Sequence, residues 1–203
     1  MSWDFLVVVL AVIAVPGADV VVTLRNTIAG GRGAGGATAL GVGAASFIQA
    51  TLVSLGLGTL IVQSQPAFTA LKWLGIAYLT FLAAQSLRSA WRGRYSLGGP
   101  ASEPRLRRRG LRQGFLTNIT NPKMLIFYLS LLPQFLEPGA SVWAWLAHAW
   151  TLPLLGTTWL LVIVVLSGSV REKLLRPGAR RVLDTISGAA LLGFSARLAL
   201  QRD

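Results

Sequence analysis

The sequence predicts an all-α membrane protein with six transmembrane helices, and three observations lead to this prediction. Hydrophobic residues make up 53% of the chain and charged residues 13%, whereas a soluble domain carries about 25% charged residues. Six apolar segments of about 20 residues, the length that crosses a bilayer, follow one another along the chain. Basic residues collect in every second link between these segments. Because no segment alternates polar and apolar residues, helices are predicted rather than barrel strands.

The six predicted helices divide the chain into two halves of three. The expected spans are Trp3–Leu24, Ala37–Val62, Ala67–Ala90, Gln113–Leu136, Trp143–Gly168 and Val182–Leu200. The segment 91–112 between the halves is rich in Gly, Pro and Arg and is predicted to be a mobile linker. We therefore expect a single transmembrane domain over residues 1–203, with one repeat at about 1–90, the basic linker at 91–112 and a second repeat at about 113–203.

The first span is predicted to remain in the protein as a membrane helix. A signal peptide begins with a basic region, but this segment carries Asp4 near its start and its apolar run continues past Pro16.

The positions of the basic residues predict the orientation. The formal net charge is +12, and 15 of the 19 Lys and Arg residues lie in or at the edge of the first, third and fifth links. Cytoplasmic loops collect Lys and Arg, so these links are predicted to be cytoplasmic and both termini to lie outside. The charge excess is therefore explained by the orientation of the helices in the membrane. A nucleic-acid role is not expected, because no soluble module surrounds the arginines of segment 91–112.

Three helices in each half place the halves in the membrane with opposite orientations, which allows an inverted repeat. The opening helix of each half contains a proline deep in the apolar run, Pro16 in the first and Pro122 in the second. A proline inside a helix removes one backbone hydrogen bond. Both helices are therefore predicted to be broken, and a broken helix survives in a membrane only against protein or a wet cavity.

A charged residue follows each predicted break: Asp19 after Pro16-Gly17, and Lys123 after Pro122. Counted at ~1.5 Å per residue from the cytoplasmic ends, both charges fall at similar depth. A charge costs about 2.5–3.5 kcal/mol at the membrane centre, so such residues are usually paired and functional. We expect an Asp19–Lys123 pair, or a zwitterionic ligand between them; a purely structural ion pair is the alternative.

Polar residues at helical spacing extend this predicted site. Thr23 and Asn26 continue the face of Asp19, and residues of the third and fourth spans are expected to face them: Tyr78, Asn118, Asn121 and Tyr128. Such groups either line a cavity or join helices by hydrogen bonds. The fifth span carries Pro153 with Thr157 nearby, and Asp184 is expected to pair with Arg180 or Arg181 at the membrane edge.

Several other functions are disfavoured by what the chain lacks. There is no Cys and a single His, His148, so no catalytic residues, metal site or cofactor are predicted. The Gly-rich run 31–36 lacks the preceding strand and the acidic residue of a dinucleotide site. An intramembrane enzyme and a metal-ion exporter remain as alternatives to a solute exporter.

The ordered motifs along the chain resemble the LysE/RhtB family of amino-acid exporters. The similar segments are Pro16-Gly17, Leu24-Arg25-Asn26, residues 30–35, residues 71–79, Asn121-Pro122-Lys123, Pro133-Gln134-Phe135 and residues 193–199. Two positions depart from the family pattern: Ala18 stands where a second proline is usual, and residues 43–49 lack the usual His. These departures predict a milder helix break and a different pocket.

The resemblance implies a proton-driven exporter of amino acids or close derivatives in the bacterial cytoplasmic (inner) membrane. Its implied partners are an amino-acid substrate, protons and the lipid bilayer. Alternating access by one inverted half rocking against the other is the expected mechanism. The identity of the amino acid and the formation of a homodimer stay open.

Overall fold

The computed structural model describes residues 2–14, 17–56, 65–92, 103–121, 124, 127–137, 139–169 and 177–200. Within these residues the protein is all-helical, with six α-helices and no strand. The α-helices are α1 (Trp3–Ala14), α2 (Ala18–Ser54), α4 (Gln65–Arg92), α5 (Glu103–Ile119), α7 (Val142–Ser169) and α9 (Pro177–Leu200). A π-helix, η1 (Phe127–Leu131), and a 3₁₀ helix, η2 (Leu132–Phe135), follow α5. The all-α prediction is confirmed.

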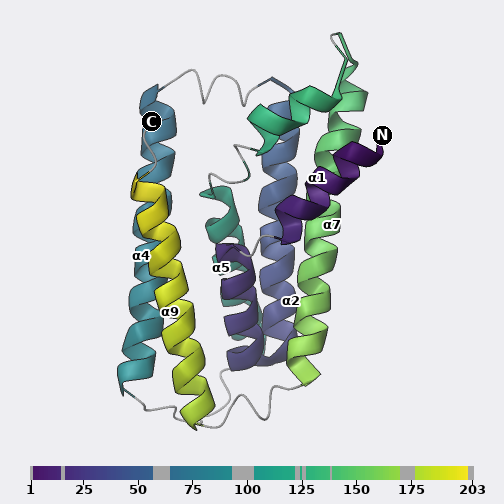
Figure 1. Cartoon of the computed structure of the whole chain (residues 1–203). Helices are drawn as coiled ribbons and strands as arrows, with labels where there is room; N and C mark the ends of the chain where they lie inside the picture. Colours follow the sequence, from purple (N-terminus) through teal and green to yellow (C-terminus); the bar gives the residue numbers. More distant parts are fainter. Residues whose placement is uncertain are drawn as a thin grey trace.

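Helix α2 is a hairpin rather than a straight rod. Gly31, at φ 79°, is the residue inside it with non-helical backbone angles, and this left-handed conformation is open to glycine at little cost. The Asn26 side-chain amide donates to the Thr38 hydroxyl at 3.0 Å, although twelve residues along a straight helix span roughly 18 Å. The two legs, 18–30 and 32–54, therefore run antiparallel and side by side (Figure 1).

Several predicted boundaries differ from the structure. The link 25–36 is helical except at Gly31, because the first two spans are joined by a single-residue turn. The predicted mobile linker is wrong at both ends: residues 91–92 close α4, and residues 103–112 form the first turns of α5. Residues 103–112 are helical because α5 has a buried face, which includes Gly110 and Gln113. Packing of this face stabilises a helix that composition alone does not favour.

The first and fourth spans are each interrupted. Helix α1 ends at Ala14 and α2 begins after Gly17, whose backbone is extended. Helix α5 ends at Ile119, and the rest of the expected fourth span contains η1 and η2 instead of a continuous α-helix. Pro16 and Pro122 lie outside the described residues, so the proline breaks and the inverted repeat stay predictions.

The helices pack in two groups that mix the two halves of the chain. Helix α2 packs chiefly on α5 and α7, and α1 contacts α7, whereas α4 packs chiefly on α9. The contacts between the groups are fewer and join α2 to α9 and α4 to α5. Figure 1 shows the α4–α9 pair standing beside the remaining helices.

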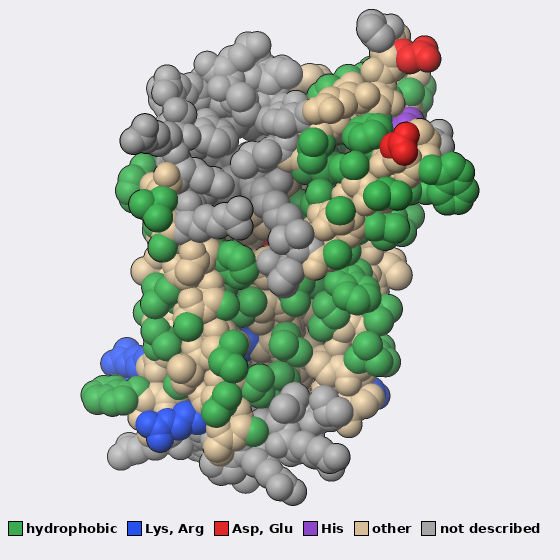
Figure 2. All heavy atoms as spheres, viewed as in Figure 1, with side chains coloured by type: hydrophobic (Ala, Val, Ile, Leu, Met, Phe, Trp, Pro, Cys, Tyr) green, Lys and Arg blue, Asp and Glu red, His purple; other side chains and the backbone are tan. Residues whose placement is uncertain are grey.

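The outer surface fits a lipid environment. Large apolar side chains are exposed along the helices, such as Leu74 and Phe81 on α4 and Leu166 on α7, and Figure 2 shows hydrophobic side chains spread over the flank. Lys and Arg lie at one end of this view and Asp and Glu at the other. In the described residues, α2 and α7 are long and apolar enough to cross a membrane, and α1 is apolar but shorter.

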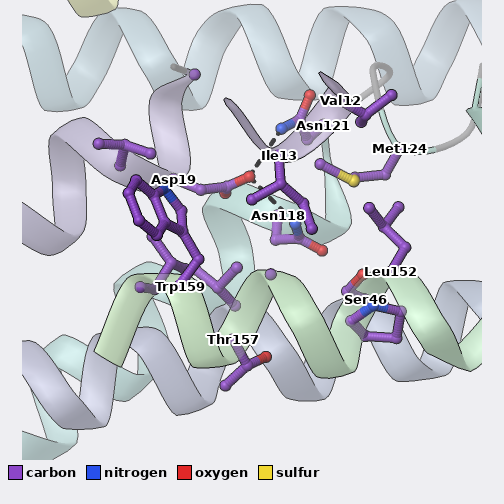
Figure 3. Close-up of a pocket in the computed structure, with 16 residues that line it drawn as sticks. Val12, Ile13, Asp19, Ser46, Asn118, Asn121, Met124, Leu152, Thr157 and Trp159 are labelled. Atoms are coloured by element: carbon purple, nitrogen blue, oxygen red, sulfur yellow. Dashed lines mark hydrogen bonds between the residues drawn. The ribbon is translucent and has the colours of Figure 1, made fainter. Parts of the chain in front are cut away.

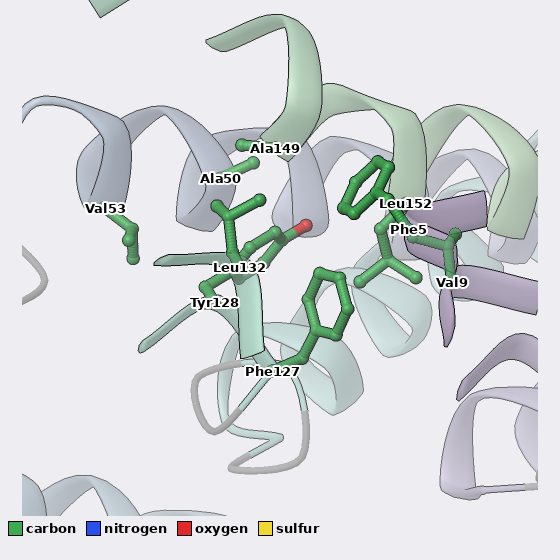
Figure 4. Close-up of a cluster of buried hydrophobic side chains, with 9 residues drawn as sticks. All are labelled: Phe5, Val9, Ala50, Val53, Phe127, Tyr128, Leu132, Ala149 and Leu152. Carbon is green, nitrogen blue, oxygen red and sulfur yellow. The ribbon is translucent and has the colours of Figure 1, made fainter. Parts of the chain in front are cut away.

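A hydrophobic core fixes the end of the bundle where the chain begins. Phe5 and Val9 of α1 pack with Leu152 of α7 and with Phe127 and Tyr128 of η1 (Figure 4). All of these side chains are at most 2% exposed, and in a membrane such close packing, rather than removal from water, holds helices together. This core holds α1 and η1 against α7, next to the two interruptions.

Candidate functional site

A pocket lies between the ends of the interrupted helices. Its walls come from the end of α1, the start of α2, the end of α5 and the middle of α7, and include Ile13, Gly17, Asp19, Asn118 and Asn121. The cavity measures about 60 Å³, and a water molecule needs at least about 10–15 Å³ of such space. The pocket therefore has room for several waters inside the bundle.

Asp19 provides the charge in this pocket. It lies in the first turn of α2, where a carboxylate is stabilised by the free backbone N–H groups and the positive end of the helix dipole. The residue is 7% exposed. The side-chain amides of Asn118 and Asn121 donate to its Oδ2 atom at 3.2 and 3.1 Å, and Figure 3 shows both amides turned toward the carboxylate. The sequence-predicted convergence of Asp19, Asn118 and Asn121 is present in the structure.

Two other buried polar atoms in the pocket wall are unsatisfied. Asn118 Oδ1 and Thr157 Oγ1 have no hydrogen-bond partner among the described residues. A buried polar atom without a partner costs about 1–3 kcal/mol, so native proteins pair such atoms with water or a ligand. The hydroxyl of Thr157 lies against Gly43 of α2, so the described polar groups that a pocket occupant would meet are chiefly the carboxylate of Asp19 and the side-chain carbonyl of Asn118.

Apolar side chains surround these polar groups. Trp159 lies beside Asp19, and Met124 and Leu152 lie near Asn121 and Asn118 (Figure 3). Pro153, within α7, is buried in the same wall. A mostly apolar cavity with a few convergent polar groups is the usual form of a small-molecule site.

The remaining predicted site residues take other positions. Tyr128 is fully buried behind the pocket, and its hydroxyl lies 3.2 Å from the hydroxyl of Ser46, which lines it. Thr23 is buried one turn beyond Asp19. Asn26 lies at the base of the hairpin, where it donates to Gln113 at 2.9 Å. Tyr78 packs against the apolar cluster around Ala18 and does not line the pocket. Pro16, Pro122 and Lys123 lie outside the described residues.

Sequence reasoning did not name Ser46 or Trp159, which the structure places in the wall together with several apolar residues. Ser46 is an isolated hydroxyl in an apolar helix and belongs to no polar stripe. The signal that pointed to α7 was Pro153, another proline inside a predicted span.

Comparisons with known proteins agree with this architecture. The chain matches the LysE type translocator family over residues 10–202. It is 30% identical over 93% of both chains to the uncharacterized membrane protein YrhP of Bacillus subtilis. It is 36% identical to the homoserine/homoserine lactone efflux protein of Salmonella typhi, over 61% of this chain and 58% of that protein. An uncharacterized membrane protein of Vibrio cholerae is 37% identical over 63% of this chain and 61% of its own length.

No solved structure shows a significant match to the chain. The family match covers nearly the whole chain, and the relative from Bacillus subtilis covers almost as much. The chain therefore belongs to the family of LysE-type translocators, and it is a membrane transporter rather than an enzyme.

Proposed function

We propose that the protein exports amino acids or close derivatives across the cytoplasmic membrane by a proton-coupled mechanism. The observation that carries the proposal is the buried carboxylate of Asp19, held by two amides in a pocket where helices from distant parts of the sequence end. A charge buried in a membrane protein is costly and usually marks the route of a substrate or ion. The efflux relative named for homoserine and its lactone supports an amino-acid-like solute.

The two ends of a zwitterionic solute have different expected partners. Asp19 would bind the ammonium group, and the side-chain carbonyl of Asn118 is a further acceptor for its N–H donors. We propose that Lys123 and backbone N–H groups at the helix ends hold the carboxylate, because helix N-termini favour anions.

Asp19 is also the candidate for the proton carrier. It is the titratable residue among the described residues that line the pocket. The carboxyl group can bind either a proton or the ammonium group of the solute, but not both at the same atoms. Proton entry is thereby coupled to release of the solute.

The packing suggests which parts of the molecule move. The sequence led us to expect that one half rocks against the other, but α2 of the first half packs mainly on α5 and α7 of the second. We propose that the α4–α9 pair moves against the group formed by α2, α5 and α7, since α2 packs far more on α5 and α7, and α4 far more on α9, than the two groups pack on each other. In this proposal the basic end faces the cytoplasm and both termini face outward.

An Asp19→Asn variant tests the proposal. The substitution keeps the size of the side chain and its contacts with the two amides but removes the charge and the proton site. In proteoliposomes loaded with homoserine, we expect an inward proton gradient to drive efflux through the unchanged protein and not through Asp19→Asn.

Asp4→Asn is the matched control, because Asp4 is exposed in the first turn of α1, outside the pocket. It should export at the unchanged rate. Full gradient-driven efflux by Asp19→Asn, reconstituted in equal amount, would exclude Asp19 from the mechanism.

A further inference from the structure

A second and larger cavity opens at the basic end of the bundle. It measures about 970 Å³ and lies between the base of the α2 hairpin, the end of α4 and the start of α5. Four arginines line this basic chamber together with polar neutral residues: Arg25, Arg88, Arg92, Arg109, Gln85 and Ser89. None of the described residues that line it is acidic.

The charges of the basic chamber are only partly compensated within the described part of the chain. The Oδ1 atom of Asp184 lies 3.9 Å from the Nε atom of Arg25. The Oδ2 atom of Asp184 accepts a hydrogen bond from the hydroxyl of Ser89 at 2.8 Å. No described carboxylate lies within ion-pair distance of Arg88, Arg92 or Arg109.

These three arginines line the same cavity, so their positive charges lie close to one another. Arg88 and Arg92 are four residues apart on α4, where like charges repel. Arg109 reaches across from α5 and donates to Gln85 of α4 at 3.2 Å. A bound anion would relieve this repulsion.

The basic chamber also lies in line with the central pocket. Asn26 lines the basic chamber and, through its amide, contacts Thr38 and Gln113. Asp19 lies seven residues earlier on the same leg of α2, which is roughly 10 Å along the axis. In the proposed route, a solute that leaves the basic chamber passes Asn26, whose contacts with Thr38 and Gln113 it would have to displace, before it reaches Asp19.

We propose that the basic chamber is an anion-binding site that receives the carboxylate of the solute before it reaches the central pocket. Guanidinium groups bind carboxylates and phosphates through paired N–H donors. The same charges repel a solute with an extra positive charge, so the basic chamber favours neutral and acidic amino acids over dibasic ones. This role rests on the export function proposed above, whereas anion binding itself does not depend on it.

The binding test uses malonate as the probe and Trp91, which lines the basic chamber, as the reporter. Malonate is titrated at constant ionic strength against protein in neutral-lipid nanodiscs, and Trp91→Phe identifies the signal. We expect Arg88→Gln/Arg92→Gln to weaken binding about tenfold, because two charge-assisted partners are lost. The control Arg105→Gln/Arg108→Gln removes the same charge from exposed positions on α5 outside the basic chamber and should bind within twofold of the unchanged protein.

Equal weakening in both double variants, or no saturable signal, would overturn the anion site. A phospholipid headgroup is the other source of the same chemistry, so the titration is repeated with 30% phosphatidylglycerol. Loss of malonate binding there would show that lipid fills the basic chamber and would overturn its role as an entrance; unchanged binding supports that role. Because malonate binding requires no transport, failed homoserine efflux with intact binding would refute only the export function.

Discussion

At the scale of single residues, the exposure of an ion pair to solvent decides how much the pair contributes to stability. Arg25 and Asp184 join α2 to α9 with side chains that are only 14% and 12% exposed, and Ser89 adds a hydrogen bond from α4. Arg107 and Glu103 form a shorter pair on α5, but they are 56% and 66% exposed. Buried charges lose hydration and depend on their partner, whereas exposed pairs contribute about 0–1 kcal/mol.

We predict that Asp184→Asn lowers the stability of the protein by about 2–4 kcal/mol, because Arg25 loses its described counter-charge. Glu103→Gln should change it by less than about 0.5 kcal/mol. Thermal unfolding in one detergent measures both. Equal effects of the two substitutions would contradict the assignment of Arg25–Asp184 as the structurally important pair.

The sequence predicted much of the central site at this scale. Asp19, Asn118 and Asn121 meet because each is a polar residue deep in an apolar span near a predicted helix break. Tyr78 is also a polar residue deep in an apolar span, although no break is predicted near it, and it packs on an apolar cluster, because depth alone does not say which way a side chain faces. Asp184 was expected beside Arg180 or Arg181, and its ion pair with Arg25 comes from a helix pairing that local sequence does not specify.

At the scale of helices, small residues allow the close crossing of α2 and α5. A Cβ atom at Gly41 would overlap the carbonyl oxygen of Leu111, and one at Gly114 would overlap that of Thr38. Both neighbours are backbone atoms, which move only if the helices separate. Close backbone approach of this kind is a main source of helix association in membranes.

We predict that Gly41→Ala destabilises the protein by about 1–3 kcal/mol through overpacking. Gly36→Ala, five residues earlier on the same leg, is the matched control, since nothing lies within 4 Å of a Cβ atom there. It should be neutral or slightly stabilising, because alanine is the better helix former. Thermal unfolding is again the measurement; a neutral Gly41→Ala would show that α2 and α5 adjust at no cost.

The helix boundaries show where prediction from sequence ends. The ranges of α4, α7 and α9 follow the apolar runs closely. Residues 103–112 were predicted as linker because of their charge, but they form a helix in which Gly110 is buried against the backbone of Ala34. That contact joins residues 76 positions apart, and composition within a short window carries no information about it.

At the scale of the whole molecule, the α4–α9 pair is held together by contacts of its own. Thr80 and Ser195 share a hydrogen bond of 2.8 Å between α4 and α9, whereas Ala29 of α2 and Leu183 of α9 line a small cavity between the two groups. The chain has no Cys, so introduced thiols would be the only ones present.

We predict that a disulfide between Thr80→Cys and Ser195→Cys leaves efflux unchanged, because both residues move with one group. A short bifunctional thiol reagent that links Ala29→Cys to Leu183→Cys should stop efflux, because it ties the two groups together. Proteoliposome efflux before and after linking, with reversal by reductant, measures both. Inhibition by the first link, or full activity with the second, would refute the proposed moving groups.

The depth of Asp19 in the bundle has an electrical consequence. An elementary charge that crosses the whole membrane gains or loses about 2.3 kcal/mol per 100 mV. Helix α2 begins partway along the bundle (Figure 1), and Asp19 lies in its first turn, in one pocket with the ends of α1 and α5. A proton that reaches Asp19 from one face therefore crosses only a fraction of that voltage. In the proposed mechanism, protonation of this carboxylate is therefore sensitive to membrane polarisation, and the voltage itself becomes a driving force that acts at a single side chain.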